Sequence, residues 1–589
     1  MQQRKEWTMG TISRRRFIQG AGIGALGLVG ASSLAACSPS NEGQAATGNS
    51  TSTGETNSTS WRTPPSEIPE SDIVTTYDCD VLVIGLGHAG CCALRAAAES
   101  GAVAIGMHDM AQESWTFQGF QMGHMNSKYL ESVGVPKVDP IEFFNDWQIR
   151  SNNRSNPGLI MNYAKHCGDT FDWLFDNISD EDYKTFSVRC LSEGGPYVRE
   201  FSGMKSWVGT AVAGEGILES ALMRCVEEAE KSGGRVLFET KGCQLVTDGD
   251  GSVIGAIGEG PDGYVKVNTS KGVIIATGGF GANEEMREDL LYEIKETMSE
   301  SNSIANMLDR DGSGIQMGYW AGGRLDPCMG TMDGAYWYPC DSPTDPLGAT
   351  AALWINAEGK RYSNEGFGST EIMALPGARQ PDGMIVTVFD SNVEELLKVQ
   401  AFGHMGFDVT TGFDALHETM DKAYAGGAKG SSDGEEEQAE AGANKSMGGG
   451  ATVYAADDLE TLGGYLGYEG EALSNFVASI ERYNELCEKG VDEDFGKDPS
   501  LLIPVNQPPY YAYGGTKEVG TLMVTVGGLL IDENGAVLGD DYRPVKGLYA
   551  AGNASGGRFG WQYFTSIAGQ SLTIAHTLGR LAGQHAASA

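Results

Sequence analysis

Three glycines at fixed spacing are the first residues of this chain whose pattern indicates chemistry. Gly85, Gly87 and Gly90 form a G-x-G-x-x-G turn between the apolar run 81–84 and an alanine-rich stretch. The first glycine of such a turn allows a tight bend, the second lets the backbone approach a pyrophosphate, and the third lets helix and strand pack closely. The helix that follows directs its N-terminus at the phosphates. The pattern predicts a dinucleotide site, with Ala89 beside the cofactor.

A second strand, expected near residues 103–107, should end in an acidic residue that holds the ribose hydroxyls. Counted from Gly85, this position falls on His108, and Asp109 stands next to it. We expect Asp109 to contact the ribose.

Two later segments indicate which dinucleotide binds. "GVIIATGGFGANEEM" (272–286) is typical of a strand that enters a glycine turn beneath the dinucleotide of an FAD protein. "PVKGLYAAGNASGG" (544–557) resembles the late FAD motif. The stretch 567–587 predicts a closing helix whose N-terminus faces the flavin pyrimidine, where negative charge develops on reduction. Three separated motifs in this order predict FAD rather than a nicotinamide cofactor alone.

Together these segments resemble the flavoprotein family of soluble fumarate reductases, flavocytochrome c, urocanate reductases and 3-ketosteroid dehydrogenases, over about residues 75–589. Further matches are "MGHMN" (122–126), "DGSGIQMGYWAGG" (311–323), "GKRYSNE" (359–365), "PPYYA" (508–512) and "VGGLLID" (526–532). The remaining expected FAD contacts are Gly123, Asn126, Ala276, Thr277, Gly278, Gly279, Gly552, Asn553, Ser571 and Leu572.

The resemblance implies an α/β fold, in which a Rossmann-like FAD-binding domain is built from two chain segments with an inserted α+β capping domain. We expect the first segment at 71–329, the cap at 330–515 and the second segment at 516–589. The chemistry that the resemblance implies is hydride transfer from flavin N5 to an activated C=C bond, followed by protonation from the protein.

The chain departs from the fumarate-reducing pattern at the polar anchors of the substrate. The position of the proton-donating arginine reads Ser369, "MVTVGG" offers no histidine, the expected histidine-proline falls near Met332 and Asp333, and "WQYFTSIAGQ" offers no arginine. A carboxylate buried without partners costs several kcal/mol, which argues against fumarate. Aromatic stretches stand instead, namely "GAYWYP", "RFGWQYF" and "PPYYAY". They predict a larger, flatter and mostly neutral substrate.

Tyr563 matches the ketosteroid dehydrogenase tyrosine that binds a substrate carbonyl, although the pattern that follows it is not kept. Tyr336 or Tyr338 is our candidate proton donor. Trp337, Ser369, Arg558 and Trp561 are expected substrate contacts. For each aromatic the alternative is packing between cap and flavin. We interpret Arg361 as structural and paired with an acid in the cap.

Four functions remain open at this stage. The first is an extracytoplasmic FAD-dependent reductase of a conjugated enone, lactone, steroid or plant phenolic. It would act in anaerobic respiration and take electrons from a separate membrane, cytochrome or flavin donor. The second is a 3-ketosteroid-type dehydrogenase. The third is a reductase of urocanate-, cinnamate- or fumarate-like acids with a rearranged site that uses Arg558 and Arg324. The fourth is an electron carrier, which the large cap argues against because a carrier needs no closed cavity.

The N-terminus predicts export. Residues 1–36 hold a twin-arginine signal, with Arg14 and Arg15 before a short apolar run that is too short to span a bilayer. "LAAC" ends in Cys37 and resembles a lipobox, so we expect a lipid anchor at the cell surface or in the periplasm; simple cleavage is the alternative. Residues 37–70 are expected to be a flexible linker.

Composition narrows the partners. A formal net charge of −38 argues against nucleic acid. No C-x-x-C pair or haem motif is present, so we expect no covalent haem and no metal site. We interpret the cysteines as buried thiols; convergence on an iron-sulfur cluster and pairing as disulfides are the alternatives.

Overall fold

The computed structural model describes residues 61–189, 198–201, 204–291, 305–306, 309–333, 350–367, 380–381, 385–400, 409, 412–429, 452–514, 521–561 and 563–589. Several predictions from the sequence lie outside these residues. They are the twin-arginine signal, Cys37, most of the linker, Tyr336, Trp337, Tyr338 and Ser369.

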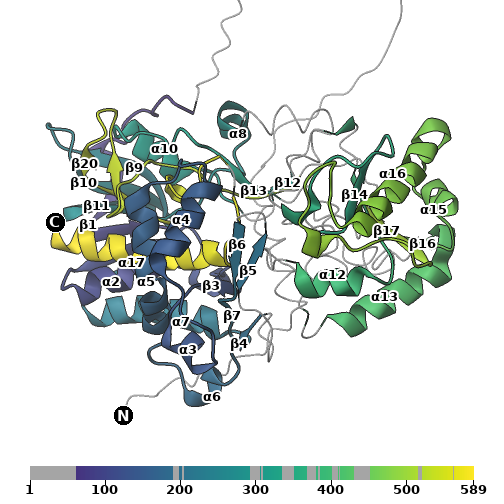
Figure 1. The fold of residues 1–589 in the computed structure, drawn as a ribbon. Helices are drawn as coiled ribbons and strands as arrows, with labels where there is room; N and C mark the ends of the chain where they lie inside the picture. Colours follow the sequence, from purple (N-terminus) through teal and green to yellow (C-terminus); the bar gives the residue numbers. More distant parts are fainter. Residues whose placement is uncertain are drawn as a thin grey trace, which may run out of the picture. The chain divides into compact units, whose positions relative to one another are not determined.

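A mostly parallel sheet forms the centre of the larger part of the chain, with strand order β19-β20-β11-β1-β2-β8. Its strands are β1 (Ile73–Ile84), β2 (Ala104–Met107), β8 (Arg235–Leu237), β11 (Gly263–Ile275), β19 (Ala536–Leu538) and β20 (Pro544–Ala550). Adjacent strands run parallel from β8 through β2, β1 and β11 to β20, while β19 runs antiparallel to β20. Two antiparallel strands extend from β11, namely β10 (Val253–Gly260) and β9 (Lys241–Thr247) (Figure 1). Strand β20 comes from the last part of the chain, so two distant segments share this sheet.

The register brings the carboxyl ends of the parallel strands to one level. Ile84 of β1 lies opposite both Ile275 of β11 and Met107 of β2. Ile275 in turn lies opposite Ala550, and Met107 lies opposite Leu237. Ligands of parallel α/β sheets bind outside these carboxyl ends. The three segments predicted to contact FAD therefore leave the sheet at a common edge.

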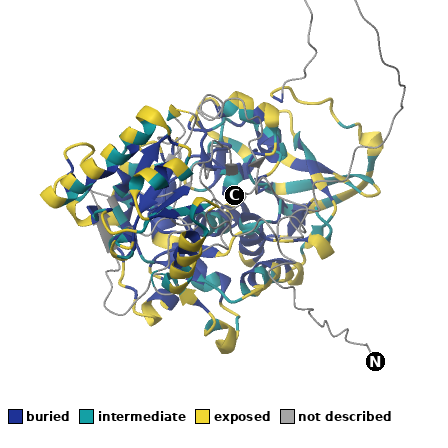
Figure 2. Ribbon diagram, turned by 90° about the vertical axis from the view of Figure 1, so that its right-hand side faces the viewer, coloured by how far each residue is buried: buried dark blue, intermediate teal, exposed yellow. Residues whose placement is uncertain are grey.

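Both faces of the sheet are covered, because alternate residues of β1 enter different hydrophobic clusters. Val81 and Val83 pack with helices α2 (His88–Glu99), α7 (Ile217–Lys231) and α17 (Gln570–Ser588). Leu82 and Ile84 pack with α4 (Pro140–Arg150), α5 (Pro157–Leu174) and α10 (Ser313–Trp320). Figure 2 shows the strands as a buried layer and the helices with exposed outer faces. A strand buried on both sides reads as a continuous apolar run, as 81–84 does.

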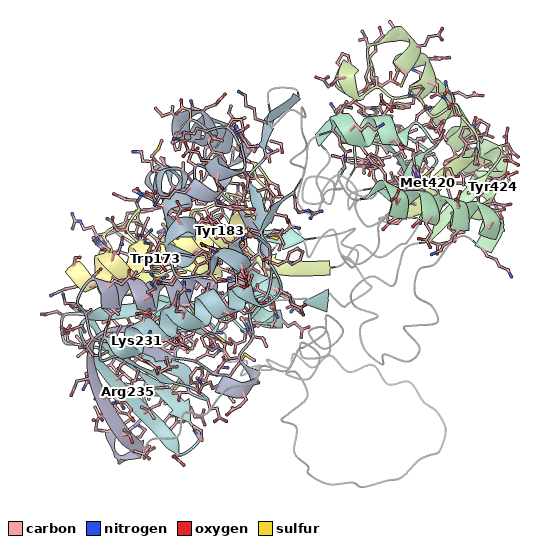
Figure 3. The ribbon with its side chains drawn as sticks, turned by 90° about the horizontal axis from the view of Figure 1, so that it is seen from below. Trp173, Tyr183, Lys231, Arg235, Met420 and Tyr424 are labelled. Atoms are coloured by element: carbon pink, nitrogen blue, oxygen red, sulfur yellow. The ribbon has the colours of Figure 1, made fainter. Side chains whose placement is uncertain are left out.

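Glycines let α17 lie directly on α2. A Cβ atom at Gly579 would stand 2.3 Å from the Ala89 carbonyl oxygen, and one at Gly583 would stand 2.2 Å from that of Ala93. Both contacts advance in the same direction along the two helices, so the helices run parallel. Trp173 of α5, labelled in Figure 3, receives the guanidinium groups of Arg95 at 4.1 Å and of Arg580 at 4.7 Å.

A second, antiparallel sheet forms the middle part of the chain, with strand order β14-β15-β17-β16. Its strands are β14 (Leu353–Asn356), β15 (Ile385–Phe389), β16 (Val453–Ala456) and β17 (Tyr510–Gly514). One face packs on α12 (Val393–Val399) and α13 (Phe413–Gly426), and the other on α15 (Leu459–Tyr465) and α16 (Gly470–Lys489). On α13, Met420 is buried in this core, while the Tyr424 hydroxyl donates to Asp457 at 2.9 Å (Figure 3).

The middle part corrects one interpretation of the aromatic stretches. Tyr511 and Tyr513, from "PPYYAY", are 5% and 2% exposed and belong to the core beside α12 and α13. They lie on β17, which has a strand on either side and helices over both faces. These two rings therefore pack in the core and do not line a substrate site.

The structural role of Arg361 is confirmed. Its guanidinium binds Glu365 through Nε and Nη2, both at 2.8 Å, and Asp492 through Nη1 at 3.0 Å and Nη2 at 2.8 Å. Lys497, 1% exposed, joins the network at 3.5 Å from Glu365. Removing one member of a buried charge network leaves the others uncompensated. The "GKRYSNE" stretch thus holds the middle part together.

A small sheet stands where the chain passes between the two parts, with order β12-β18-β13. It comprises β12 (Ala305–Asn306), β13 (Thr331–Asp333) and β18 (Thr521–Thr525).

Trp61, inside the predicted linker, is 5% exposed and donates to Glu285 and Asp289 at 2.9 Å each. The domain boundaries themselves stay predictions.

Candidate active site

The turn after β1 has the geometry that its glycines predict. Gly85 has φ +91°, and a Cβ there would lie 2.6 Å from the Ala276 carbonyl oxygen. A Cβ at Gly90 would lie 1.8 Å from the carbonyl oxygen of Gly85, so helix and turn are in direct contact. At Gly87 nothing lies within 4 Å of the Cβ position. The middle glycine therefore faces open space, as a backbone that is approached by a pyrophosphate must.

Two long helices begin at this edge without side-chain caps. Gly87 precedes α2 and Gly569 precedes α17, and neither glycine has a side chain that could accept from the first N–H groups of its helix. The first N–H groups of a helix have no partner within the helix and favour negative charge. Since Gly579 of α17 lies beside Ala89, α17 begins about eight residues before the start of α2, or roughly 12 Å further out. Ser571 and Leu572 occupy its first turn. The N-terminus of α2 thus suits the phosphates, and the N-terminus of α17 suits a more distant part of the cofactor.

The glycine turn after β11 is fixed by one buried carboxylate. Asp309 accepts from the backbone N–H groups of Gly279 and Gly281, both at 2.9 Å. It also accepts from the backbone N–H of Thr525 at 2.8 Å and from its hydroxyl at 2.7 Å. Burial raises the pKa of Asp309, and these hydrogen bonds oppose the rise. Asp309 thereby ties the predicted contacts Ala276, Thr277, Gly278 and Gly279 to strand β18.

At the end of β2, the side chains of His108 and Asp109 have different environments. His108 is 7% exposed and its Nδ1 accepts from the Leu86 backbone N–H at 3.3 Å, so the imidazole supports the glycine turn. The Asp109 side chain is 50% exposed, with its Oδ1 3.6 Å from His108 Nδ1. The exposed Asp109 carboxylate can therefore accept a hydrogen bond from a hydroxyl group, and its contact with the ribose stays a prediction.

Gly123 and Asn126 lie on and just after β3 (Gln121–Gly123). A Cβ at Gly123 would stand 2.3 Å from the Ala568 carbonyl oxygen, which brings this segment against the start of α17. Asn126 has φ +62°, and its amide exchanges hydrogen bonds of 2.9 Å with the backbone of Val138. The Asn126 side chain thus closes its own loop, and its FAD contact stays a prediction.

The loop after β20 contains a buried cation. Gly552 has φ +66°, and a Cβ there would lie 3.0 Å from that of Ala89. Asn553 Oδ1 accepts from Nη1 of Arg558 at 3.0 Å, and Arg558 Nε donates to the Ser555 carbonyl at 3.2 Å. Arg558 is 0% exposed. It therefore contacts a predicted FAD-binding residue, and its predicted substrate contact stays untested.

The segment 559–564 divides its aromatic rings between core and surface. Phe559 and Phe564 pack on Trp147 of α4, with ring centroids at 5.2 and 4.7 Å. Tyr563 is 0% exposed and its ring lies 4.7 Å from that of Phe559. Trp561 is 51% exposed. Of these four rings, only Trp561 presents its surface; the roles of Trp561 and Tyr563 toward a substrate stay predictions.

Sequence reasoning missed a group of histidines near the two helix N-termini, of which His124 and His576 are buried and His88 is half-buried. His88, the first residue of α2, has Nδ1 2.9 Å from Nε2 of His576 and Nε2 2.7 Å from the Gln118 carbonyl oxygen. A carbonyl can only accept, so His88 Nε2 donates and its Nδ1 accepts from His576. His124 bonds the Met122 carbonyl at 2.9 Å and the Ser127 hydroxyl at 2.7 Å. No spacing signal marks these residues, because they come from three separate elements.

Burial keeps these imidazoles neutral. It lowers the pKa of His88 and of His124 to about 4 each. It also lowers the pKa of His576 well below the usual value, with further lowering by His88 and His124.

The described residues fit FAD. The open position at Gly87, the two uncapped helices and a buried Thr277 hydroxyl without a hydrogen-bond partner leave donors at the common sheet edge. Donors rather than carboxylates at this edge suit a pyrophosphate. Among the described residues, no cluster of histidine, cysteine, aspartate or glutamate could hold a metal ion.

Comparison with known proteins agrees with this geometry. The family model "FAD binding domain" matches residues 80–566, and the chain belongs to this family. It is 26% identical to the vinyl phenol reductase of Lactiplantibacillus plantarum, covering 86% of this chain and 96% of the relative. It is also 26% identical to the fumarate reductase (cytochrome) of Shewanella frigidimarina, covering 86% and 77%. The crystal structure of 3-ketosteroid-Δ4-(5α)-dehydrogenase from Rhodococcus jostii RHA1 superposes with a TM-score of 0.62 at 22% identity, covering 89% of this chain and 99% of the other. The protein is an FAD-dependent oxidoreductase.

Replacing Gly87 should separate cofactor binding from folding. Because a Cβ at Gly87 meets no protein atom, Gly87→Ala should unfold at the same urea concentration as the wild-type apoprotein. Its methyl group enters the space expected for the pyrophosphate, so FAD affinity should fall at least tenfold. Fluorescence titration of apoprotein with FAD measures this. Gly249→Ala, also in open space but in a surface turn, is the control and should keep wild-type affinity. Equal affinity of both variants would contradict the assignment of this turn.

Acid should destabilise the fold through the buried histidines. His124 has a folded pKa of about 4 against about 6.5 when unfolded, so the unfolded chain binds the extra proton. Its contribution is fully present above pH ~6.5 and is lost as the pH falls toward ~4, by about 3 kcal/mol. Urea unfolding across this range measures the loss.

The His124→Gln variant should show a flatter pH dependence than the wild type, while the exposed His166→Gln should not. If His124→Gln retained the full wild-type slope between pH 6.5 and 4, the neutral buried state of His124 would be wrong.

Proposed function

We propose that the protein reduces an activated C=C bond of a mostly neutral substrate that is aromatic or resembles a steroid, lactone or enone. FAD, when bound, supplies the hydride from N5. The chain's own residues position the substrate, exclude water and provide the proton. The observation that carries the proposal is the match along almost the whole length of the vinyl phenol reductase, whose name specifies a neutral aromatic alkene.

The charge distribution at the late loop supports a neutral substrate. Within the described residues from 552 to 569, Arg558 is the only cation, and it is buried against Asn553. A substrate carboxylate would need a charged or hydrogen-bonding clamp to offset its desolvation. Trp561 offers an exposed indole at the same loop. An aromatic surface without an accessible cation favours stacking on a flat, uncharged molecule.

Tyr563 is the candidate for polarising the substrate carbonyl or phenol oxygen. It follows Trp561 closely in the chain, and its hydroxyl acts electrostatically on Arg558. A neighbouring cation stabilises negative charge on an oxygen that binds the phenol. Tyr336 or Tyr338, which lie outside the described residues, remains the proposed proton donor.

A carboxylate reductase is the second candidate, because the Shewanella relative is named for fumarate. It would require Arg558 to turn toward the substrate. A 3-ketosteroid-type dehydrogenase uses the same site in the opposite direction, and the partner that accepts or donates electrons decides between them.

The substrate class can be tested by rapid mixing without oxygen. Dithionite-reduced enzyme is mixed with a vinyl phenol, a 4-ene-3-ketosteroid, an unsaturated lactone, a stilbene, fumarate, urocanate and cinnamate, while flavin absorbance reports reoxidation. We expect fast reoxidation by a neutral alkene and none by fumarate. Tyr563→Phe should slow it about 10²-fold, the usual effect of losing one oxyanion donor.

Tyr549→Phe is the matched control, since Tyr549 is a buried tyrosine of β20 in the cluster on the α2 side of the sheet. It should react at the wild-type rate. Fast reoxidation by fumarate, urocanate or cinnamate alone would overturn the neutral-substrate proposal and favour the second candidate.

We further propose that the protein is exported by the twin-arginine route and tethered through lipid on Cys37. Its electrons would then come from a separate membrane, cytochrome or flavin donor. Among the described residues, none of the helices combines the length and apolar character that a bilayer crossing requires. The leader and the lipobox carry this proposal.

Substitution of the leader residues tests the location. Arg14→Lys combined with Arg15→Lys should leave most of the protein inside the cell, and Cys37→Ser should release it from the membrane fraction. Fractionation with immunoblotting measures both. Membrane association of Cys37→Ser equal to the wild type would contradict the lipid anchor.

A further inference from the structure

Arg558 is a cation that the fold buries without completing its hydrogen bonds. It is 0% exposed, and its Nη1 and Nε bind Asn553 and the Ser555 carbonyl. Its Nη2 is buried and has no hydrogen-bond partner among the residues that the structure describes. Both of the partners it has are neutral oxygen atoms. Within the described part of the chain, a guanidinium with five N–H donors is therefore held by two hydrogen bonds.

The nearest acids do not neutralise it. Asp326 and Asp309 both act on its charge from a distance, but Arg558 forms no ion pair within the described part of the chain. Asp326 instead accepts from the backbone N–H of Cys328 at 2.9 Å and of Gly557 at 2.6 Å. Asp309 is occupied by the turn after β11. Both carboxylates thus accept hydrogen bonds from backbone N–H groups. Among the described residues, the guanidinium has no carboxylate in direct contact.

Arg558 stays charged at neutral pH in spite of this. Burial lowers its pKa to about 10, and Asp326 and Tyr563 oppose part of that shift. A buried charge of this kind costs several kcal/mol of folding free energy relative to an apolar side chain. A fold that retains it without an ion pair has a cation placed for something other than stability.

The surroundings fix where this cation stands. Trp147 Nε1 donates to the Arg558 carbonyl oxygen at 2.8 Å, which anchors its backbone to α4. Its partner Asn553 follows Gly552, whose Cβ position is 3.0 Å from that of Ala89 at the start of α2. Asn553 is the half-buried residue of the pair and the one predicted to contact FAD. The guanidinium therefore lies behind Asn553, the residue predicted to contact FAD, and is itself 0% exposed.

We propose that Arg558 is a positioning residue that orients Asn553 and places a fixed positive charge behind the flavin, which raises the reduction potential of bound FAD. Two electrons and one proton convert the oxidised flavin into a reduced form with one negative charge, and a nearby buried cation stabilises that form selectively. This role differs from the substrate contact that the sequence predicted. It goes beyond the proposed function and rests only on FAD binding, so it holds for any substrate.

The reduction potential of the holoenzyme tests the proposal. Arg558→Leu should lower the equilibrium constant for two-electron reduction by 10- to 100-fold, or about 30–60 mV, measured by equilibration with a reference dye. Arg558→Gln, which keeps length and polarity, should show the same shift. Arg558→Lys keeps the charge, so its equilibrium constant should remain within about twofold of the wild type. Arg482→Leu removes a cation of α16 that is 44% exposed and pairs with Asp494 at 3.0 Å, and it should not change the potential.

A purely structural role predicts different results. In Arg558→Gln, it would leave the equilibrium constant for two-electron reduction within about twofold of the wild type while lowering the urea midpoint of unfolding. That outcome overturns the proposal. A substrate role would change KM with the potential unaltered, which also overturns it. If Arg558→Leu fails to fold, Arg558→Gln decides. An equal loss of potential in Arg558→Lys would show that the fork geometry, and not the charge, matters, and would reject charge placement.

Discussion

The level alignment of the parallel strand ends is the constraint on which the whole site depends. Ile84, Ile275 and Ala550 stand opposite one another, although they come from segments far apart in the chain. Their successors therefore meet at one edge, where Ala276 N–H bonds the Ile84 carbonyl at 2.8 Å and Ala551 N–H bonds that of Ile275 at 2.9 Å. A slip of one residue would move each turn and reverse the faces of the strand. The cofactor site is thus a consequence of register.

Close backbone approach is the second requirement, and glycine meets it. The contacts at Gly85, Gly90 and Gly579 leave no space for a Cβ atom, so the turn, α2 and α17 are brought together more tightly than side chains would allow. Polar groups then lock the arrangement. Asp309 joins the turn after β11 to β18, at the place where the chain returns from the middle part. This carboxylate therefore adds a polar link between two chain segments that the pairing of β11 with β20 already joins.

The buried titratable groups of this protein differ in how their charge is handled. Arg361, Glu365 and Asp492 neutralise one another and hold the middle part together. The histidines His88, His124 and His576 are kept neutral by burial, so they add no charge beneath the helix N-termini. Arg558 alone of these groups keeps a charge without a counter-ion among the described residues. This buried cation beside the cofactor motif is therefore the charge to which we assign a role toward FAD.

The sequence by itself determined the cofactor and the fold class, because glycine spacing after an apolar run reflects local backbone geometry. The strand at 81–84, the closing helix and the structural role of Arg361 all followed from local pattern. Only the tertiary structure decided what depends on distant segments. It placed Tyr511 and Tyr513 in a core, since β17 is covered on both faces. It also paired His88 with His576 and left Arg558 behind Asn553. Such contacts join residues hundreds of positions apart or bury a side chain by packing, and no local spacing encodes either.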